Sequence, residues 1–303
     1  MKKNFPSLGK PRLLIVGCGD VGRRLIPLLR ARFRVIALTS QTTTHASLRA
    51  LGAWPICANL DHPATLARLS ELAHYIVHLA PPRADPASTG DQRTRNLLAI
   101  LPDNSRLVYI STTGVYGDGA GAWFDETRPV QPASPRGQRR VAAEKLVRAW
   151  AVRSHSCASI LRVPGIYAAD RLPLERLQKA TPALCAEDDV YTNHIHADDL
   201  ARLIVLTLFR GAPNRVYHAV DDTEMKMADY FDLVADSFGL SRPPRLHRDA
   251  LAQQLSPLQM SFMVESRRLR NHRIKTELGA VLRYATVGHG IQAARIERPP
   301  RSL

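Results

Sequence analysis

Three glycines near the start of the chain have the spacing of a phosphate-binding turn. Gly17, Gly19 and Gly22 directly follow the apolar run at residues 13–16, which is typical of a strand buried on both faces. In such a turn the first glycine permits the bend, the second lets backbone approach a pyrophosphate, and the third lets the next helix pack on the strand. The stretch predicts dinucleotide binding, with an ordinary strand–turn–helix as the alternative.

A second group of polar residues follows the apolar run at residues 106–110. It reads STTGVYG and includes Thr112 and Tyr116. Hydroxyl groups at the carboxyl end of a strand can hydrogen-bond a substrate oxygen, because ligands bind at that edge of a parallel sheet. A turn that serves only chain geometry is the alternative reading.

Alternating strands and helices must position these residues. Further strands are expected at residues 34–38, 54–57 and 75–79, and helices at 61–72, 91–101 and 225–238, the first of them capped by Asp61. This alternation predicts an α/β fold with a doubly wound parallel sheet of the Rossmann type and a smaller, discontinuous C-terminal substrate lobe. We expect the Rossmann domain at 10–166 and 190–222, and the lobe at 167–189 and 223–303.

Composition is typical of a globular cytoplasmic protein. The 303 residues are 45 % hydrophobic and 23 % charged, and no apolar run reaches the roughly 18 residues of a membrane span. We expect no signal peptide and no membrane partner. The four cysteines are scattered without metal-ligand spacing, which favours reduced thiols.

The formal net charge of +15 raises the question of a polyanionic partner. No aromatic residues interleave with the densest arginine cluster, Arg267, Arg268, Arg270 and Arg273, and no nucleic-acid-binding motif is present. We therefore expect no nucleic-acid partner. An anionic small molecule needs only one or two arginines.

The end of the second strand bears on coenzyme choice. Thr39 and Ser40 stand where an acidic residue would bind the ribose hydroxyls of NAD, and no acid follows until Asp61. Arg23, Arg24 and Arg49 occur nearby in sequence. We favour NADP over NAD, with solvated arginines as the alternative.

Several motifs in order resemble the extended and atypical short-chain dehydrogenase/reductase superfamily, in the NAD-dependent epimerase/dehydratase family. Besides the glycine turn they are HLAPP (78–82), STTGVYGD (111–118), DETRPVQPASP (125–135), LRVPGIY (161–167), NHIHADDLA (193–201) and SRRLRNHRIKTELG (266–279). The resemblance implies hydride-transfer chemistry on nucleotide sugars or similar molecules, and a possible homodimer. It implies coenzyme contacts at Gly17, Gly19, Asp20, Val21, Gly22, Thr39, Ser40, Leu60, Ala80, Pro81, Arg140, Pro164, Gly165 and Ile166.

The chain departs from the family at its Tyr-x-x-x-Lys pair. In the matching text, Arg136 stands at the position of the proton-donating tyrosine and Arg140 at that of the lysine. A guanidinium stays protonated at working pH and cannot shuttle a proton. Thr112 matches the family's substrate-orienting hydroxyl, and the expected catalytic residues are Thr112, Tyr116, Arg136 and Arg140.

Three readings of this departure stay open. The first is an oxidoreductase or epimerase with a relocated acid/base, Tyr116 before Tyr167. The second is a non-catalytic NAD(P)-binding sensor or scaffold protein. The third is an enzyme on an anionic substrate that Arg136 holds. No metal site is expected, because His194 and His196 alternate across a strand and the acidic run at 187–189 reads as a solvated turn.

Overall fold

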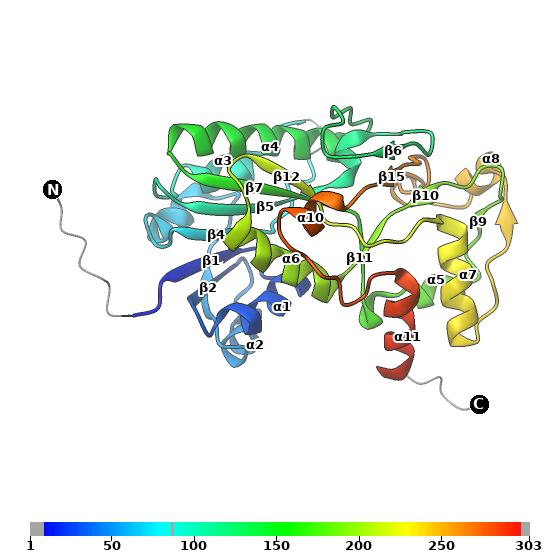
Figure 1. Ribbon diagram of the computed structural model, residues 1–303, viewed down its shortest axis with the longest axis horizontal. Coiled ribbons are helices and arrows are strands. Elements are labelled where there is room, and N and C mark those ends of the chain that lie inside the picture. Colours follow the sequence, from blue (N-terminus) through cyan, green and yellow to red (C-terminus); the bar gives the residue numbers. More distant parts are fainter. Residues whose placement is uncertain (1–8, 86–87, 298–303) are drawn as a thin grey trace. The chain divides into compact units, whose positions relative to one another are not determined.

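The computed structural model describes residues 9–85 and 88–297 (Figure 1). By compactness these residues divide into two units. Unit 1 comprises the described residues up to Ser111, Gln138–Arg162 and Ala201–Tyr217; unit 2 comprises Thr112–Gly137, Val163–Leu200 and the described residues from His218 onward. The domain boundaries expected from the sequence, which place residues 163–166 in the Rossmann domain, stay a prediction.

Unit 1 is built on a seven-stranded parallel sheet with the order β12-β7-β5-β4-β1-β2-β3. Its strands are β1 (Arg12–Val16), β2 (Arg34–Thr39), β3 (Trp54–Cys57), β4 (Tyr75–His78), β5 (Arg106–Thr112), β7 (Cys157–Val163) and β12 (Arg215–His218). The chain proceeds outward from β1 to β3 and then returns to β4 on the other side of β1. In open α/β sheets, ligands bind at such a switch point, outside the carboxyl ends of the strands.

Helices cover both faces of this sheet, because four consecutive residues of β1 are buried and successive side chains point to opposite faces. The helices are α1 (Asp20–Leu29), α2 (His45–Ala50), α3 (Gln92–Leu98), α4 (Pro135–Arg153) and α6 (Ala197–Arg210), with 3₁₀ helices η1 (Thr42–Thr44) and η2 (Pro63–Leu69). Leu14 and Val16 pack in one buried cluster with α3 and α4, whereas Leu13 and Ile15 are buried outside that cluster. Figure 1 shows α3 and α4 on one side of the strands and α1 on the other. The doubly wound fold is confirmed.

Unit 2 consists of short paired strands around a helical core. The parallel pairs are β6 (Trp123–Phe124) with β15 (Arg268–Leu269), β8 (Gly165–Tyr167) with β11 (His194–His196), and β9 (Ala183–Leu184) with β14 (Arg245–Leu246). The antiparallel pair is β10 (Tyr191–Thr192) with β13 (Met225–Lys226). The helices are α5 (Leu174–Gln178), α7 (Met227–Phe238), α8 (Arg248–Ala252), α9 (Pro257–Met260), α10 (His272–Thr276), α11 (Val287–Glu297), η3 (Thr113–Tyr116) and η4 (Ala169–Arg171). Phe231 and Val234 of α7 anchor the core against Leu177 and Ile291.

Two expected helices differ from the structure. The segment after Asp61 forms η2 rather than an α-helix, with Pro63 in its first turn and His62 as its N-cap. Asp61 does not cap it, because its carboxylate pairs with Arg93. The helix expected from residue 225 begins two residues later, since Met225 pairs with Thr192 in β13. Among residues 9–85 and 88–297, no helix has both the length and the apolar character that crossing a bilayer requires.

Candidate functional site

The glycine turn of unit 1 brings two strand ends into backbone contact. Gly17 has φ +89°, and a Cβ there would lie 2.7 Å from the backbone nitrogen of Ala80, directly after β4. A Cβ at Gly22 would lie 3.2 Å from Cys18 Sγ, whereas one at Gly19 would meet nothing within 4 Å. Gly17 and Gly22 are therefore required for packing, and the open side at Gly19 leaves room for a ligand beside the backbone.

The amino-terminal end of α1 has the features of a phosphate site. Its N-cap is Gly19, which has no side chain to cap the first turn of the helix, where the backbone N–H groups point along the helix axis. Asp20 directs its carboxylate to Arg24 at 3.0 Å, one turn along the helix. The helix dipole and these N–H groups together favour an anion at this end.

A guanidinium of α1 reaches α2, the helix that follows the loop after β2. Arg23 donates to Ser47 Oγ at 2.7 Å, in the segment that follows β2. Thr39 Oγ1 accepts from Gln41 N at 3.1 Å, which folds the loop back on itself, and Ser40 is exposed. This loop therefore presents hydroxyls and a positive charge, with no carboxylate at the strand end.

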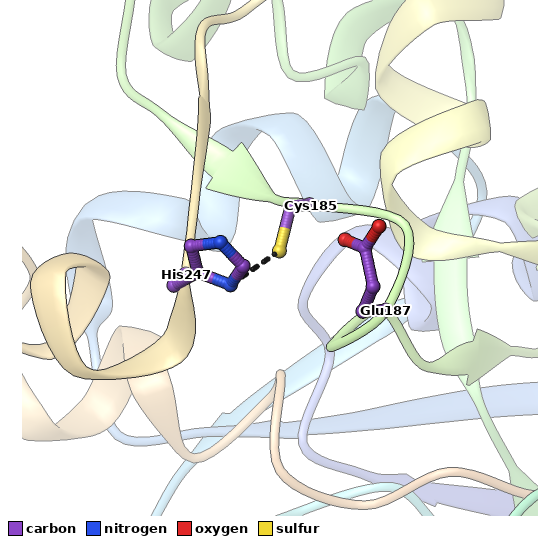
Figure 2. Close-up of side chains that lie close together, drawn as sticks. All are labelled: Cys185, Glu187 and His247. Atoms are coloured by element: carbon purple, nitrogen blue, oxygen red, sulfur yellow. Dashed lines mark hydrogen bonds between the residues drawn. The ribbon is translucent and has the colours of Figure 1, made fainter.

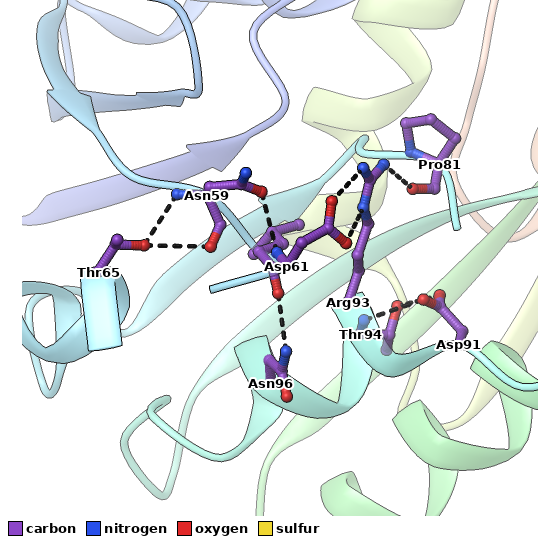
Figure 3. A network of polar contacts seen from close by, with 9 residues as sticks. Asn59, Asp61, Thr65, Pro81, Asp91, Arg93, Thr94 and Asn96 are labelled. Carbon is purple, nitrogen blue, oxygen red and sulfur yellow. Dashed lines mark hydrogen bonds and ion pairs between the residues drawn. The ribbon is translucent and has the colours of Figure 1, made fainter. Parts of the chain in front are cut away.

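A polar network holds the loops after β3 and β4 (Figure 3). Arg93 of α3 donates to both carboxylate oxygens of Asp61, at 2.8 and 2.6 Å, and to the carbonyl of Pro81 at 3.2 Å. Asn96 Nδ2 donates to Leu60 O at 2.8 Å. The hydrogen bond from Arg93 lowers the pKa of Asp61, so the pair stays charged. Leu60 and Pro81, both expected to contact the coenzyme, are thus held by Asn96 and Arg93, respectively, which the sequence had not indicated.

A buried histidine lies beneath the same edge of the sheet. His78, at the end of β4, is bonded through Nε2 to Thr94 Oγ1 at 2.9 Å, and Thr94 donates to Asp91 Oδ2 at 2.6 Å. Because the threonine proton goes to Asp91, His78 Nε2 must carry the proton it donates. Burial, followed by the charge of Arg140, lowers the pKa of His78 to about 3. His78 is therefore neutral and structural, and only Asp91 could have been anticipated, as the N-cap of a helix.

Arg140 is held against the end of β5. Its Nη1 donates to the hydroxyl of Tyr109 at 3.0 Å and to the carbonyl of Ile110 at 2.8 Å. Burial raises the pKa of Tyr109 to about 12 despite the guanidinium, so this hydroxyl stays protonated. Arg140 is thus a fixed positive charge near the carboxyl end of β5.

One turn further along α4, a buried ion pair ties the helix to two strands. Arg162 donates to both carboxylate oxygens of Glu144, at 3.1 and 2.7 Å, and both side chains are 5 % exposed. Ser111 Oγ donates to the same carboxylate at 2.6 Å. Glu144 follows Arg140 by four residues, so this pair orients the helix face that carries Arg140.

In unit 2, the hydroxyl residues after β5 form a tight turn. Thr112 is the N-cap of η3, and its Oγ1 accepts from Gly114 N at 3.3 Å. Tyr116 ends η3 and is 2 % exposed. Its ring packs edge-on against Phe124, with centroids 5.6 Å apart.

Tyr116 makes a short contact with a buried histidine. Its hydroxyl lies 2.5 Å from His218 Nε2, and His218 Nδ1 lies 2.9 Å from the carbonyl of Arg270. A carbonyl only accepts, so Nδ1 carries a proton, and in the neutral ring Nε2 accepts from the tyrosine. Tyr116 therefore donates a hydrogen bond to His218 Nε2. Sequence reasoning did not find His218, which carries no motif of its own.

The other expected residues of unit 2 lie on α4 and β8. The Arg136 guanidinium stacks over the Phe262 ring at 4.5 Å. Gly165 and Ile166 pair in parallel with His194 and Ile195 of β11, and Pro164 immediately precedes them. Tyr167 is buried, its hydroxyl donates to Thr286 O at 3.2 Å, and burial raises its pKa.

Each unit thus collects part of the expected set. Unit 1 holds the coenzyme residues Gly17, Gly19, Asp20, Val21, Gly22, Thr39, Ser40, Leu60, Ala80, Pro81 and Arg140. Unit 2 holds Thr112, Tyr116, Arg136, Pro164, Gly165 and Ile166. The roles of these residues stay predictions.

The histidines of β11 pack against aromatic rings. The His194 ring lies 4.5 Å from that of Tyr230, and the His196 ring 3.8 Å from that of Tyr284. Burial lowers the pKa of His194 to about 4, so it is neutral at physiological pH. Both rings therefore pack in the core of unit 2.

Comparisons with known proteins agree with this geometry. The model of the NAD dependent epimerase/dehydratase family matches residues 13–219. Among curated proteins, the dTDP-D-glucose 4,6-dehydratase of Mus musculus is 26 % identical over 130 residues, which cover 40 % of this chain and 37 % of the mouse protein. The chain thus spans less than half the length of the first curated relatives that it matches.

Solved structures are similar over nearly the whole chain. A functionally unknown conserved protein from Silicibacter pomeroyi DSS is 29 % identical, with a TM-score of 0.76 over 95 % of this chain and 99 % of that one. The dTDP-glucose 4,6-dehydratase of Streptomyces venezuelae, solved with NAD and TYD bound, is 21 % identical, with a TM-score of 0.74 over 95 % and 97 %. The second likeness supports the fold alone.

Proposed function

The chain belongs to the NAD dependent epimerase/dehydratase family, and from this premise we propose that it binds a nicotinamide dinucleotide and catalyses hydride transfer as an oxidoreductase or epimerase. The observation that carries the proposal is the turn at Gly17, whose Cα hydrogen faces the Ala80 backbone at a distance that excludes any side chain. Gly19 leaves the adjoining backbone open, and the uncapped start of α1 supplies N–H donors for a pyrophosphate. The residues present fit this group.

We propose NADP as the preferred coenzyme. Ser47 anchors the Arg23 guanidinium beside the end of β2, and Thr39 and Ser40 there offer hydroxyls instead of a carboxylate. A carboxylate at this position accepts from the ribose hydroxyls of NAD and repels a 2′-phosphate. A guanidinium attracts that phosphate through charge-assisted hydrogen bonds.

We propose that the two arginines on α4 have electrostatic rather than proton-transfer roles. Arg140 is fixed by Tyr109 and the Ile110 carbonyl and supplies a positive field where the family's lysine would lie. Arg136 is exposed and stacks on Phe262, which orients its fork for a carboxylate or phosphate of the substrate. This arrangement supports an anionic substrate, such as a nucleotide-sugar-like molecule.

For the proton, we propose the Tyr116–His218 couple. Tyr116 already donates to His218, whose other nitrogen is tied to the Arg270 carbonyl. Transfer of the hydroxyl proton to Nε2 would give a tyrosinate beside an imidazolium, which is a base for a substrate hydroxyl. In the reverse direction the pair returns the proton to a carbonyl oxygen. Thr112, four residues earlier, would orient that oxygen.

The alternative is a coenzyme-binding sensor or scaffold protein without turnover. One observation favours it: Tyr116 and Tyr167 are both 2 % exposed, and the hydroxyl of each is already engaged. A buried hydroxyl reaches a substrate only if the surrounding residues rearrange. The two proposals make different predictions for substitution of Tyr116.

The test combines coenzyme titration with an oxidoreductase and epimerase screen on nucleotide sugars and other anionic carbonyl or alcohol compounds. We expect NADP to bind more tightly than NAD, and turnover to fall by about 100-fold in Tyr116→Phe with coenzyme affinity unchanged. Tyr75→Phe, which removes a tyrosine hydroxyl from β4 of unit 1, away from Tyr116 in unit 2, is the matched control. Tight coenzyme binding with no turnover on the screen would favour the scaffold. Binding of neither coenzyme would refute both proposals.

A further inference from the structure

Two paired strands of unit 2 place a cysteine and a histidine side by side. β9 and β14 run parallel, and Cys185 and His247 are the residues that follow each strand. The pairing continues one step further, because Cys185 N donates to Leu246 O at 2.9 Å. The thiol and the imidazole are therefore held by strand register rather than by a flexible loop.

The chain then turns so that the carboxylate of Glu187 lies near the thiol and the imidazole (Figure 2). Asp188 N donates to Cys185 O at 3.1 Å, which closes a turn over residues 185–188. Cys185 Sγ lies 3.1 Å from His247 Nδ1 and 3.6 Å from Asp188 Oδ2, and Asp188 Oδ2 lies 3.4 Å from His247 Nδ1. A ligand atom of Glu187 lies within 4.8 Å of those of Cys185 and His247. Cys185, His247 and Asp188 thus lie within 3.6 Å of one another, and Glu187 stands beside the first two.

These separations are those of a tetrahedral zinc site. Bond lengths of about 2.3 Å to sulfur and about 2.0–2.1 Å to nitrogen or oxygen place the ligand atoms of a tetrahedron about 3.5 Å apart along a sulfur edge and about 3.3 Å apart along a nitrogen–oxygen edge. The separations of 3.6 Å between sulfur and oxygen and 3.4 Å between nitrogen and oxygen match these values, and the 3.1 Å between sulfur and nitrogen is about 0.4 Å shorter. Thiolate, imidazole and carboxylate are also the donor types that zinc prefers.

Hydrogen bonds from neighbouring backbone and side-chain groups hold Asp188 in place. Asp188 Oδ2 accepts from Arg248 N at 2.9 Å, and the Arg248 side chain donates to Asp188 O at 2.6 Å and to Met263 O at 2.8 Å. Asp189 does not take part in this cluster, because its carboxylate accepts a hydrogen bond from Ala228 N at 3.1 Å, at the start of α7. The acidic run is therefore divided between a helix terminus and the convergent donors. Such bracing of ligands is typical of metal sites.

We propose that Cys185, Glu187, Asp188 and His247 bind a divalent zinc ion that pins the β9 end to the β14 end of unit 2. All four positions are occupied by protein groups, which is typical of a structural rather than a catalytic zinc. The proposal does not depend on the proposed function. The sequence did not indicate this site, because Cys185 and His247 are 62 residues apart and share no short ligand motif. The alternative is a hydrogen-bonded thiol–imidazole pair without a metal.

The test is a titration of the full-length reduced protein with Co²⁺ after chelation, followed by competition with Zn²⁺. We expect one cobalt ion per chain, a thiolate-to-cobalt charge-transfer band, the intense visible bands of tetrahedral cobalt, and loss of all of them as zinc displaces cobalt. Cys185→Ser should abolish the charge-transfer band, and His247→Ala should weaken cobalt binding by about 100-fold or more. Zinc should raise the Tm of the wild type but not of Cys185→Ser.

Matched controls are Cys57→Ser and His289→Ala, which remove exposed groups elsewhere and should keep the wild-type spectrum. Absence of the charge-transfer band in the wild type at stoichiometric cobalt would overturn the proposal. Persistence of that band in Cys185→Ser would also overturn it, by showing that another thiol binds the metal. The wild-type spectrum does not depend on any variant folding, so the proposal stays testable if a variant does not.

Discussion

Replacing Glu144 by Gln should destabilise the protein strongly, whereas replacing the whole Glu144–Arg162 pair by apolar residues should not. Both side chains are 5 % exposed, and the guanidinium makes two hydrogen bonds to the carboxylate. Removing one partner leaves the other charge buried without its counter-ion, which costs about 3–5 kcal/mol. With an entropy of unfolding of about 2.1 cal/mol/K per residue over 303 residues, that corresponds to a fall in Tm of roughly 5–8 °C. Replacing both ions, as in Glu144→Leu with Arg162→Met, also removes the cost of desolvating them, so the double variant should lie near the wild type.

The assay is thermal and urea unfolding of the wild type, of Glu144→Gln, and of the double variant with Glu144→Leu and Arg162→Met. Glu175→Gln is the matched control, because Glu175 pairs with Lys179 on the surface and its loss should leave Tm unchanged. Ser111 donates to Glu144 at 2.6 Å, so Ser111→Ala is added to the variant that lacks both ions, because its buried hydroxyl would otherwise lose its acceptor. A double variant as unstable as Glu144→Gln, or a Glu144→Gln variant as stable as the control, would refute the reasoning.

Three further predictions concern the coenzyme turn and a buried carboxyl. Arg23→Ala should remove about 1.5–3 kcal/mol of binding free energy and so raise the Kd for NADPH roughly 10–150-fold. Fluorescence titrations should show an unchanged Kd for NADH. An equal rise in Kd for both coenzymes would exclude a contact between Arg23 and the 2′-phosphate. Gly17→Ala should lower Tm and abolish binding of both coenzymes, because its Cβ would lie 2.7 Å from Ala80 N; calorimetry showing wild-type affinity would contradict this. Burial raises the pKa of Asp221 to about 7. Its protonation therefore contributes up to about 4 kcal/mol to the free energy of unfolding. This contribution should be complete below about pH 4 and be lost as the pH rises through about 7. Urea unfolding of Asp221→Asn should lack this slope, and parallel curves for wild type and variant would contradict the assignment.

The parts of the fold that the sequence predicted are those encoded by neighbouring residues. Glycine spacing and the apolar run before Gly17 predicted β1, the turn and α1 in place. Asp91 was not expected as a cap, and the residue expected to cap a helix, Asp61, instead pairs with Arg93, 32 residues away. Short-range patterns contain no information about such a partner, because it is chosen by tertiary packing.

The same limit applied to the candidate site. Tyr116 was a candidate acid/base because it lies four residues after Thr112, but His218, its hydrogen-bond partner, lies 102 residues later in the sequence. Arg140 was read as a coenzyme and field residue, and its hydrogen bonds to Tyr109 and the Ile110 carbonyl depend on how α4 packs against β5. Residue types could therefore be predicted along one segment, whereas the pairs that orient them required the fold.

The contrast between Arg140 and His218 bears on whether this chain can catalyse proton transfer without the family's tyrosine–lysine pair. A lysine near a tyrosine lowers the pKa of the phenol by its charge. Arg140 carries such a charge but directs it to Tyr109, which burial keeps protonated. His218 offers Tyr116 a lone pair instead, because its Nδ1 proton is committed to the Arg270 carbonyl. The Tyr116–His218 couple could thus move a proton without a neighbouring cation, and its activity would follow the protonation of an imidazole rather than of a lysine. A pH–rate profile with its acid limb set by a histidine, and lost in His218→Gln, is the signature that separates this mechanism from both the family dyad and an inert scaffold.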